Sequence, residues 1–372
     1  MIVIDADAHV MESEETWSRL ASEFHGRRPV VVRFPEDTSL GVFNAAWLID
    51  EKVRLFGASP TAGTRSLRKK YNLDSQHLAI PDERLKDMDR RKLDYQIIHP
   101  TFGLMNICED VALETALMKS YNTVLAEKCK ASGGRLYYNA MVPFRDPAAA
   151  VAEIRRVAEM GSAVAVFMRG IEWDRPVADP SHFPIYEAAE QHGLAMAVHV
   201  GSGSPGLRQV FGHLHRVPGE EPFWPAHMKR YVGPIGVQFG FYSLVESSAP
   251  TDFPKLHWAF LEATGCEWLL GAVGSLERAG KMNTRRLFDD GRVFVGCEPN
   301  EDLAYVTNRM GADFAVIGSD MPHQDEAAHE DLVGEFEVRR KDLGDAFMNK
   351  LLCANAARLY GIDPRPMVRP IG

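Results

Sequence analysis

The chain has 372 residues, enough for one large barrel or two average domains, and its composition, 45% hydrophobic and 25% charged, is that of a soluble globular protein. Its net charge of -9 is spread along the sequence without a basic stripe, so we do not expect it to bind nucleic acid. No apolar run approaches the roughly 18 residues of a membrane-spanning helix, and the first residues lack the pattern of a secretory signal. We therefore expect a cytoplasmic protein that binds neither a membrane nor nucleic acid.

The chain begins with a short apolar strand, residues 2–4, that runs into the polar sequence Asp5-Ala6-Asp7-Ala8-His9. Alternate side chains of a strand share a face, so Asp5, Asp7 and His9 project together. Two carboxylates beside an imidazole favour a divalent cation. A pattern this short is also typical of a solvated chain terminus. Only the residues at the ends of later strands can distinguish a metal site from such a terminus.

The next segment, about residues 10–81, shows no clear periodicity. A stretch of this length in a compact protein usually belongs to a functional loop or lid, and surface padding is the other interpretation.

From residue 81 onward, helical and strand patterns alternate. Start signals such as Asp146 followed by Pro147 mark several of the helices. A second irregular segment, about residues 201–236, follows the strand that ends at His199. The predicted helices cover residues 82–93, 109–132, 146–160, 183–192, 237–248, 267–281, 302–310, 331–343 and 345–360, and the predicted strands end near Asp5, His99, Val142, Met168, His199, Glu262, Cys297 and Ser319.

Strands that alternate with helices predict a parallel sheet, and this number of units predicts an α/β fold, a (β/α)8 TIM barrel. We expect one domain, residues 1–372, with long loop insertions after strands 1 and 5. An open, doubly wound sheet would carry a glycine-rich fingerprint after its first strand, where this chain has Asp7 and His9. The barrel is therefore the favoured fold.

The functional face of such a barrel lies at the carboxyl ends of its strands. Each polar residue there is, by itself, more often a satisfied polar group or a surface charge than a ligand. Their joint convergence on one rim is harder to obtain by accident. The residues at these ends are Asp7, His9, His99, Arg169, His199, Glu262, Glu298, Asp320 and His323.

The motifs at these strand ends resemble the amidohydrolase superfamily, in the branch of metal-dependent hydrolases and decarboxylases related to aminocarboxymuconate semialdehyde decarboxylase. The resemblance covers nearly the whole chain. It rests on residues 4–9, on His99-Pro100-Thr101, on His199, on Phe260-Leu261-Glu262, and on residues 318–323 and 355–360.

The resemblance implies that Asp7, His9, His199 and Asp320 hold a divalent metal ion and that Asp320 also takes a proton from the metal-bound water. The chemistry is sound on general grounds, because a divalent cation held by imidazoles and carboxylates lowers the pKa of its water to about 7. Zinc is the default expectation. The carboxylates also make manganese or iron plausible.

Two positions depart from the pattern of the superfamily. Asp7 replaces the first histidine of its common H-x-H motif, and Glu262 replaces the histidine that many relatives have on the sixth strand. Glu262 either coordinates a second cation with His199, shuttles a proton, or pairs with Arg169. We expect one metal ion, with a second left open by Glu262. No lysine or carboxylate ends the fourth strand to bridge two metals.

Arg169 is the candidate anchor for an anionic group of the substrate, with a structural salt bridge as the alternative. His99 is a candidate substrate-binding residue and His323 a candidate catalytic residue, and packing roles stay open for both. Asp320 and Glu262 complete the candidate catalytic set.

The first functional hypothesis is a metal-dependent hydrolase that attacks the carbonyl of an ester, thioester, amide or lactone. The second is a metal-dependent, non-oxidative decarboxylase, ranked lower because such relatives usually keep the histidine that Glu262 replaces. The third is a non-catalytic barrel that binds a small ligand, which the intact ligand set disfavours. In each case we expect a small-molecule ligand or substrate and a homodimer.

Overall fold

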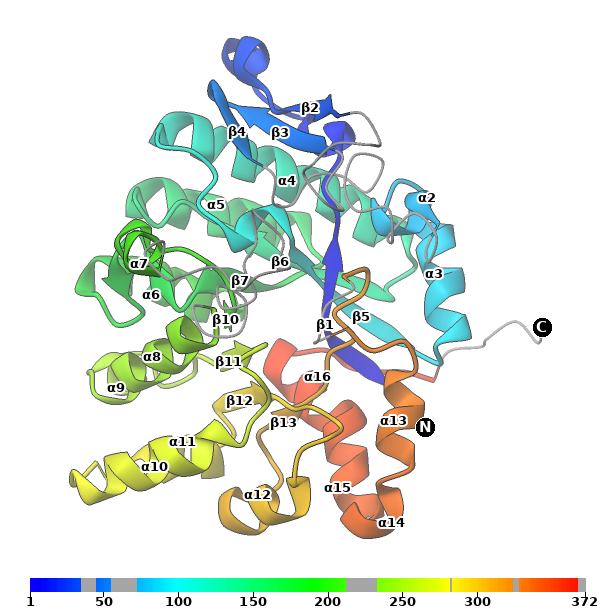
Figure 1. Cartoon of the computed structure of the whole chain (residues 1–372), viewed down its shortest axis with the longest axis vertical. Coiled ribbons are helices and arrows are strands. Elements are labelled where there is room, and N and C mark those ends of the chain that lie inside the picture. The colour runs from blue at the N-terminus through cyan, green and yellow to red at the C-terminus, as the bar shows by residue number, and fades with distance from the viewer. Residues whose placement is uncertain (35–44, 55–71, 212–232, 282, 324–327, 367–372) are drawn as a thin grey trace.

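A computed structural model describes residues 1–34, 45–54, 72–211, 233–281, 283–323 and 328–366. Within these ranges a parallel sheet of eight strands surrounds the centre of the molecule (Figure 1). Backbone hydrogen bonds close the sheet, since Ala6 donates to the carbonyl of Ile317 at 2.8 Å and Asp320 donates to that of Asp7 at 2.9 Å. The strands, in order around the barrel, are β1 (Ile4–Val10), β5 (Tyr95–Pro100), β6 (Leu136–Met141), β7 (Ala163–Arg169), β10 (Ala195–His199), β11 (Trp258–Leu261), β12 (Val293–Gly296) and β13 (Ala315–Val316).

Helices form the outer layer of this (β/α)8 barrel, which is the predicted fold (Figure 1). Asp110 and Asp146 begin two of them by accepting hydrogen bonds from the first-turn backbone amides. The outer helices are α3 (Pro81–Arg90), α4 (Val111–Ala131), α5 (Pro147–Met160), α6 (Phe183–Gln191), α8 (Gly233–Val245), α9 (Ala249–Asp252), α10 (Trp268–Arg278), α11 (Asn283–Asp289), α12 (Leu303–Met310), α13 (Leu332–Glu337), α14 (Arg340–Leu343) and α15 (Asp345–Asn349).

The barrel interior is filled by small and branched side chains. Ala6, Ala165, Ala197 and Ala259 belong to a buried cluster that also contains residues of the last helix, α16 (Asn355–Tyr360). This helix contacts β1 and β13, and the Tyr360 hydroxyl donates to the Ala6 carbonyl at 3.1 Å. A second, larger cluster lies between the strands and the outer helices.

Some elements differ from the prediction. The first strand does not end near Asp5, because β1 continues to pair with β5 as far as Val10 and Pro100. The predicted helix over residues 331–343 is divided into α13 and α14, and the helix over 345–360 contains a π-helical turn, Lys350–Ala354, between α15 and α16. No pattern indicated α11.

The insertion after β1 has its own structure. It contains two 3-10 turns, a three-stranded antiparallel sheet and the short helix α2 (Leu73–Gln76), and the sheet lies with α4 at the top of Figure 1. Trp17 and Trp47 are buried and contact Phe102, so these aromatic residues fix the insertion to the loop after β5. The turns are η1 (Glu14–Trp17) and η2 (Ser22–Arg27), and the strands are β2 (Val30–Arg33), β3 (Ala45–Ile49) and β4 (Lys52–Arg54).

The described part of the second insertion consists of the loop after β10 and helix α7 (Pro205–Phe211). Other parts of the two predicted insertions, residues 35–44, 55–71 and 212–232, lie outside the described residues. In the part of the chain that the structure describes, no helix is both long and apolar enough to cross a membrane. The remaining short elements are η3 (Phe102–Leu104), η4 (Pro180–His182) and the hairpin of β8 (Ile171–Glu172) and β9 (Arg175–Pro176).

Candidate metal centre

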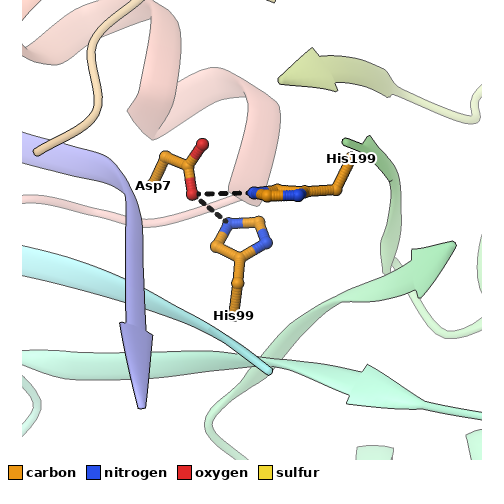
Figure 2. Close-up of side chains that lie close together, drawn as sticks. All are labelled: Asp7, His99 and His199. Carbon is orange, nitrogen blue, oxygen red and sulfur yellow. Dashed lines mark hydrogen bonds and ion pairs between the residues drawn. The ribbon is translucent and has the colours of Figure 1, made fainter. Parts of the chain in front are cut away.

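Side chains from distant parts of the chain meet at the carboxyl ends of the strands. Asp7 and His9 come from β1, His199 ends β10, and Asp320 follows β13, and all of them are buried. The structure thus brings together the ligand set that the resemblance implies. Figure 2 shows the Asp7 carboxylate directed at the rings of His199 and His99.

The distances between these side chains suit one metal ion. The Nε2 atom of His199 lies 3.1 Å from Asp7 Oδ1, and Nε2 of His9 lies 3.5 Å from that oxygen and 3.4 Å from Asp320 Oδ1. Two ligand atoms that are each about 2.1 Å from a tetrahedral ion lie about 3.4 Å apart. The side chains therefore need little rearrangement to surround a divalent cation.

His9 supplies the clearest sign that the site needs a ligand. The residue is fully buried, and neither of its ring nitrogens has a hydrogen-bond partner among the described residues. A buried polar group without a partner costs about 1–3 kcal/mol. A cation bound to Nε2 would remove part of this cost.

The tautomer of His199 also suits metal binding. Its Nδ1 lies 3.0 Å from the backbone carbonyl of Val200 and can donate to it, which leaves the lone pair of Nε2 directed at Asp7. A backbone carbonyl that orients a ligating imidazole in this way is a recurrent feature of metal sites.

The charges of Asp7 and His199 are strongly linked. Burial acts to lower the pKa of His199, but the Asp7 carboxylate outweighs it and raises that pKa to about 9. Burial acts to raise the pKa of Asp7, and the charges of His199 and His99 hold it well below its usual range. Without a metal, a proton thus occupies the space between the two groups, and a cation would displace it.

His99, a predicted substrate-binding residue, is fully buried beside Asp7. Its Nε2 lies 3.2 Å from the Ala6 carbonyl, and its Nδ1 lies 3.0 Å from Asn139 Nδ2. These partners fit a neutral ring with the proton on Nε2, and burial lowers the pKa of His99 to about 4. The ring is thus placed to support Asp7 from below, with Asn139 as a support that no sequence motif indicated.

Glu262 and Asp320 carry the two carboxylates at the open side of the centre. Both have a left-handed backbone, with φ angles of 55° and 52°, a strained conformation that is common at functional sites. Glu262 Oε2 lies 3.7 Å from His199 Nε2, and 15% of the Glu262 side chain is exposed. Burial, together with the charge of Asp320, raises the pKa of Glu262 to about 8, which favours the protonated form of this carboxyl group in the metal-free protein.

His323 connects Asp320 to the loop after β5. Its Nδ1 lies 2.6 Å from Asp320 Oδ1, its Nε2 lies 2.8 Å from Thr101 Oγ1, and its ring stacks on that of His9 at 4.2 Å. Glu12 holds the same loop by accepting a hydrogen bond from the Phe102 amide at 2.8 Å. Thr101 is part of a motif recognised in the sequence, whereas nothing in the pattern indicated Glu12.

Arg169, the predicted substrate anchor, lies in a buried ion pair. Its guanidinium group donates to both carboxylate oxygens of Glu172, and its Nη1 donates to the Gly103 carbonyl at 3.1 Å. This is the salt bridge that the sequence left as the alternative, and it involves Glu172 rather than Glu262. A role in holding the substrate stays a prediction.

A second polar layer lies directly below the metal ligands. Asp5 accepts hydrogen bonds from the amide and hydroxyl of Ser319, at 2.9 and 2.6 Å, and from Gln96 Nε2 at 2.7 Å. Arg84 donates to Gln96 Oε1 at 2.6 Å and to the His9 carbonyl at 2.9 Å. Gly318 lets β13 approach β1, since a Cβ atom there would lie 2.4 Å from Asp7 Cβ.

Comparison with known proteins identifies a family for this chain and solved structures with a similar fold. Residues 4–266 match the family profile described as Amidohydrolase. An amidohydrolase from Mycobacterium avium subsp. paratuberculosis K-10 is 19% identical, with a TM-score of 0.76 over 97% of this chain and 99% of that chain. The 5-carboxyvanillate decarboxylase of Sphingomonas paucimobilis is 22% identical, with a TM-score of 0.60 over 76% of this chain and 84% of that chain.

A third similar structure contains a metal. It is a 5-carboxyvanillate decarboxylase from Novosphingobium aromaticivorans DSM 12444 with bound manganese and 3-methoxy-4-hydroxy-5-nitrobenzoic acid. This protein is 17% identical, with a TM-score of 0.61 over 75% of this chain and 80% of that chain. At these identities the likeness establishes a shared fold.

Proposed function

We propose that this chain, which belongs to the amidohydrolase family, is a metal-dependent enzyme that decarboxylates a small aromatic or unsaturated carboxylic acid without an oxidant. Decarboxylation needs a group that delivers a proton to the carbon atom that loses CO2. Glu262 is the observation that carries the proposal, because its half-buried carboxyl group lies 3.7 Å from His199 Nε2, beside the proposed ligands, and burial with the charge of Asp320 raises its pKa to about 8 in the metal-free protein, which favours the protonated form.

The position of Glu262 changes the order of the two hypotheses drawn from the sequence. Decarboxylation ranked second there because a glutamate replaces the usual histidine. A protonated glutamate can donate to carbon as an imidazolium can, so the replacement no longer argues against this reaction. Two of the similar structures are those of decarboxylases, which adds support.

We propose that Asp7, His9, His199 and Asp320 hold one divalent ion. When bound, the ion would act as a Lewis acid that fixes the carboxylate of the substrate. The mixed set of carboxylates and imidazoles suits manganese as well as zinc, and the manganese in a similar structure makes it our first choice. Metal analysis of the purified protein by mass spectrometry tests both the identity and the stoichiometry.

The chain's own groups then complete the reaction. The bond between the ring or alkene carbon and the carboxylate breaks, its electron pair stays on the carbon, and CO2 leaves. Glu262 donates its proton to that carbon and becomes a carboxylate. Its partly exposed side chain allows it to recover a proton from solvent.

Hydrolysis remains the second candidate because of one observation. Asp320, His323 and Thr101 form a chain from carboxylate to imidazole to hydroxyl, which is suited to accept and relay a proton from water. This series of hydrogen-bonded groups has no evident proton to move during decarboxylation. In that reaction it would only orient Asp320.

Product analysis in D2O separates the two reactions. Manganese-loaded protein is incubated with a panel of hydroxybenzoic and α,β-unsaturated acids and, in parallel, with aryl esters and lactones. We expect CO2 and a product with one deuterium at the former carboxyl position, and a loss of roughly 10²-fold or more in Glu262→Gln. Ester or lactone cleavage without CO2 release would contradict the proposal. The predicted homodimer can be checked on the same sample by light scattering.

A further inference from the structure

Two half-buried arginines lie on the insertions, Arg54 on β4 and Arg208 on α7. Arg54 is opposite Trp47 in the small sheet, and Trp47 contacts Phe102 in the loop after β5. Neither arginine appears in a sequence motif, and neither has an ion-pair partner among the residues that the structure describes. They differ in this from Arg169, whose charge Glu172 compensates.

Arg208 is fixed at the meeting point of two loops. Its Nη1 donates to Asn106 Oδ1 at 2.8 Å and to the Ser202 carbonyl at 2.6 Å. The Ser202 amide donates to the Leu104 carbonyl at 2.7 Å, which joins the loops to each other. These loops begin directly after His99 and His199, so the guanidinium group stands over the same end of the barrel as the metal ligands.

Polar atoms beside Arg208 lack partners. Ser202 is 6% exposed, and its hydroxyl group makes no hydrogen bond within the described part of the chain. The buried Nε of Arg54 has none either. Among the described residues, only Nη1 of the Arg208 guanidinium group has hydrogen-bond partners, which leaves Nε and Nη2 as available donors there.

The acidic residues nearest to these arginines are engaged elsewhere. Glu114 pairs with Arg145, and Glu109 pairs with Lys52 at 3.6 Å. Asp174 accepts hydrogen bonds from the Ser204 hydroxyl and from the Gly206 amide at 3.0 Å. Among the described residues, the region therefore holds more positive than negative charge in a partly desolvated setting.

The pKa of Arg208 reflects this excess of positive charge, whereas that of Arg54 is shifted by burial. Burial lowers the pKa of Arg54, and burial followed by the charges of Arg169 and Arg54 lowers the pKa of Arg208. An oxyanion would neutralise the excess and accept from the unused donors, since the planar guanidinium fork matches carboxylate and phosphate oxygens.

We propose that Arg54, Arg208 and Ser202 form a binding site for an oxyanion and that its ligand is a second, distal carboxylate of the substrate. The inference rests on the proposed function for the first carboxylate, which lies at the metal. It narrows the substrate class to dicarboxylic acids, with one acidic group at the reacting end and one at the arginines. A free inorganic oxyanion such as phosphate shares the chemistry and is the other possible source.

Calorimetry of the manganese-loaded protein tests the site with a matched pair of ligands, benzoate and isophthalate. We expect isophthalate to bind at least tenfold more tightly than benzoate, and Arg208→Met and Arg54→Met each to abolish most of this preference while benzoate affinity stays unchanged. Arg208→Lys, which keeps the charge but loses the fork, should retain part of the preference. The exposed Arg278→Met on α10 is the matched control and should behave as wild type.

A titration of the metal-free protein with inorganic phosphate distinguishes the source of the ligand. If phosphate binding depends on Arg54 and Arg208 but the protein shows no preference for isophthalate, the oxyanion site exists. Its proposed role in binding the distal carboxylate of the substrate is then overturned. An isophthalate preference that survives in both methionine variants, whose folding is checked by circular dichroism, would overturn the site itself. Neither measurement needs turnover, so an enzyme that fails to release CO2 but shows the arginine-dependent preference would refute only the proposed function.

Discussion

Two polar layers lie one above the other inside the barrel, and they differ in how completely their groups are satisfied. In the lower layer, Asp5, Gln96, Arg84 and Ser319 hydrogen-bond to one another and to nearby backbone groups. In the upper layer, both ring nitrogens of the buried His9 lack hydrogen-bond partners among the described residues, and the carboxylates of Asp7 and Asp320 both face that ring.

The difference separates a structural network from a binding site. The lower layer is complete as a protein network and holds the ends of β1, β5 and β13 in register. The upper layer gathers charge that only a proton or a cation can balance. Substitutions in the lower layer should therefore act on folding, and those in the upper layer on metal binding and activity.

The largest effect should follow a change in the upper layer. Asp320→Asn removes one ligand charge while keeping a side chain that tolerates the left-handed backbone. We expect loss of most of the bound metal and a fall in turnover on the order of 10³-fold, with the free energy of unfolding of the metal-free protein unchanged or increased. Metal analysis, steady-state kinetics and urea unfolding measure the three quantities, and full metal occupancy would show that Asp320 is not a ligand.

A change in the lower layer should give the reverse pattern. Asp5→Ala leaves the amide and hydroxyl of Ser319 and the amide of Gln96 without their acceptor, which should cost about 3 kcal/mol of unfolding free energy. Urea denaturation measures this loss, with the exposed Asp363→Ala as control. If the variant is as stable as wild type but loses its metal, Asp5 belongs to the upper layer.

Gly318→Ala tests the close approach of β13 to β1 beside Asp7. The added methyl group would lie 2.4 Å from Asp7 Cβ, so β1 and β13 must move apart. We expect a loss of about 1–3 kcal/mol in stability together with a roughly tenfold weaker affinity for the metal. Gly271→Ala in α10, where nothing lies within 4 Å of the added atom, should instead be neutral or stabilising.

The smallest expected effect is a pH dependence confined to the metal-free protein. His199 has a pKa raised to about 9 in the folded chain, so its stabilising contribution is complete below its unfolded pKa of about 6.5 and is lost as pH rises through 9. Glu262, whose pKa is raised to about 8, adds to the decline up to that pH. Thermal unfolding should show a fall in stability between pH 6.5 and 9 that saturating metal suppresses, and equal pH profiles with and without metal would contradict the linkage.

The sequence predicted the barrel because its signal is local and repeated, with an apolar strand followed by a capped helix. It also predicted the rim residues, since a residue at a strand end has only one place in such a fold. The predicted end of the first strand near Asp5 was wrong, because the polar residues from Asp5 to His9 resemble a solvated terminus until their pairing with β5 is known.

The supporting residues were beyond prediction for a different reason. Asn139, Glu12 and Arg84 act through contacts with residues far away in the chain, and their local sequences look like ordinary strand, loop and helix. No sequence pattern indicated a functional role for Arg54. Its lack of an ion-pair partner among the described residues depends on the pairing of Glu114 and Glu109 with other cations, which only the structure shows.

The contact between Ser319 and Asp5 joins residues that are 314 positions apart in the sequence. Chain closure over such a distance is slow, and it has to wait until β13 has been synthesised. The two halves of the proposed ligand set, Asp7 with His9 and Asp320, thus come together only after β13 has been made. The proposed metal site is completed late, and we expect the folded protein, not the nascent chain, to select the ion.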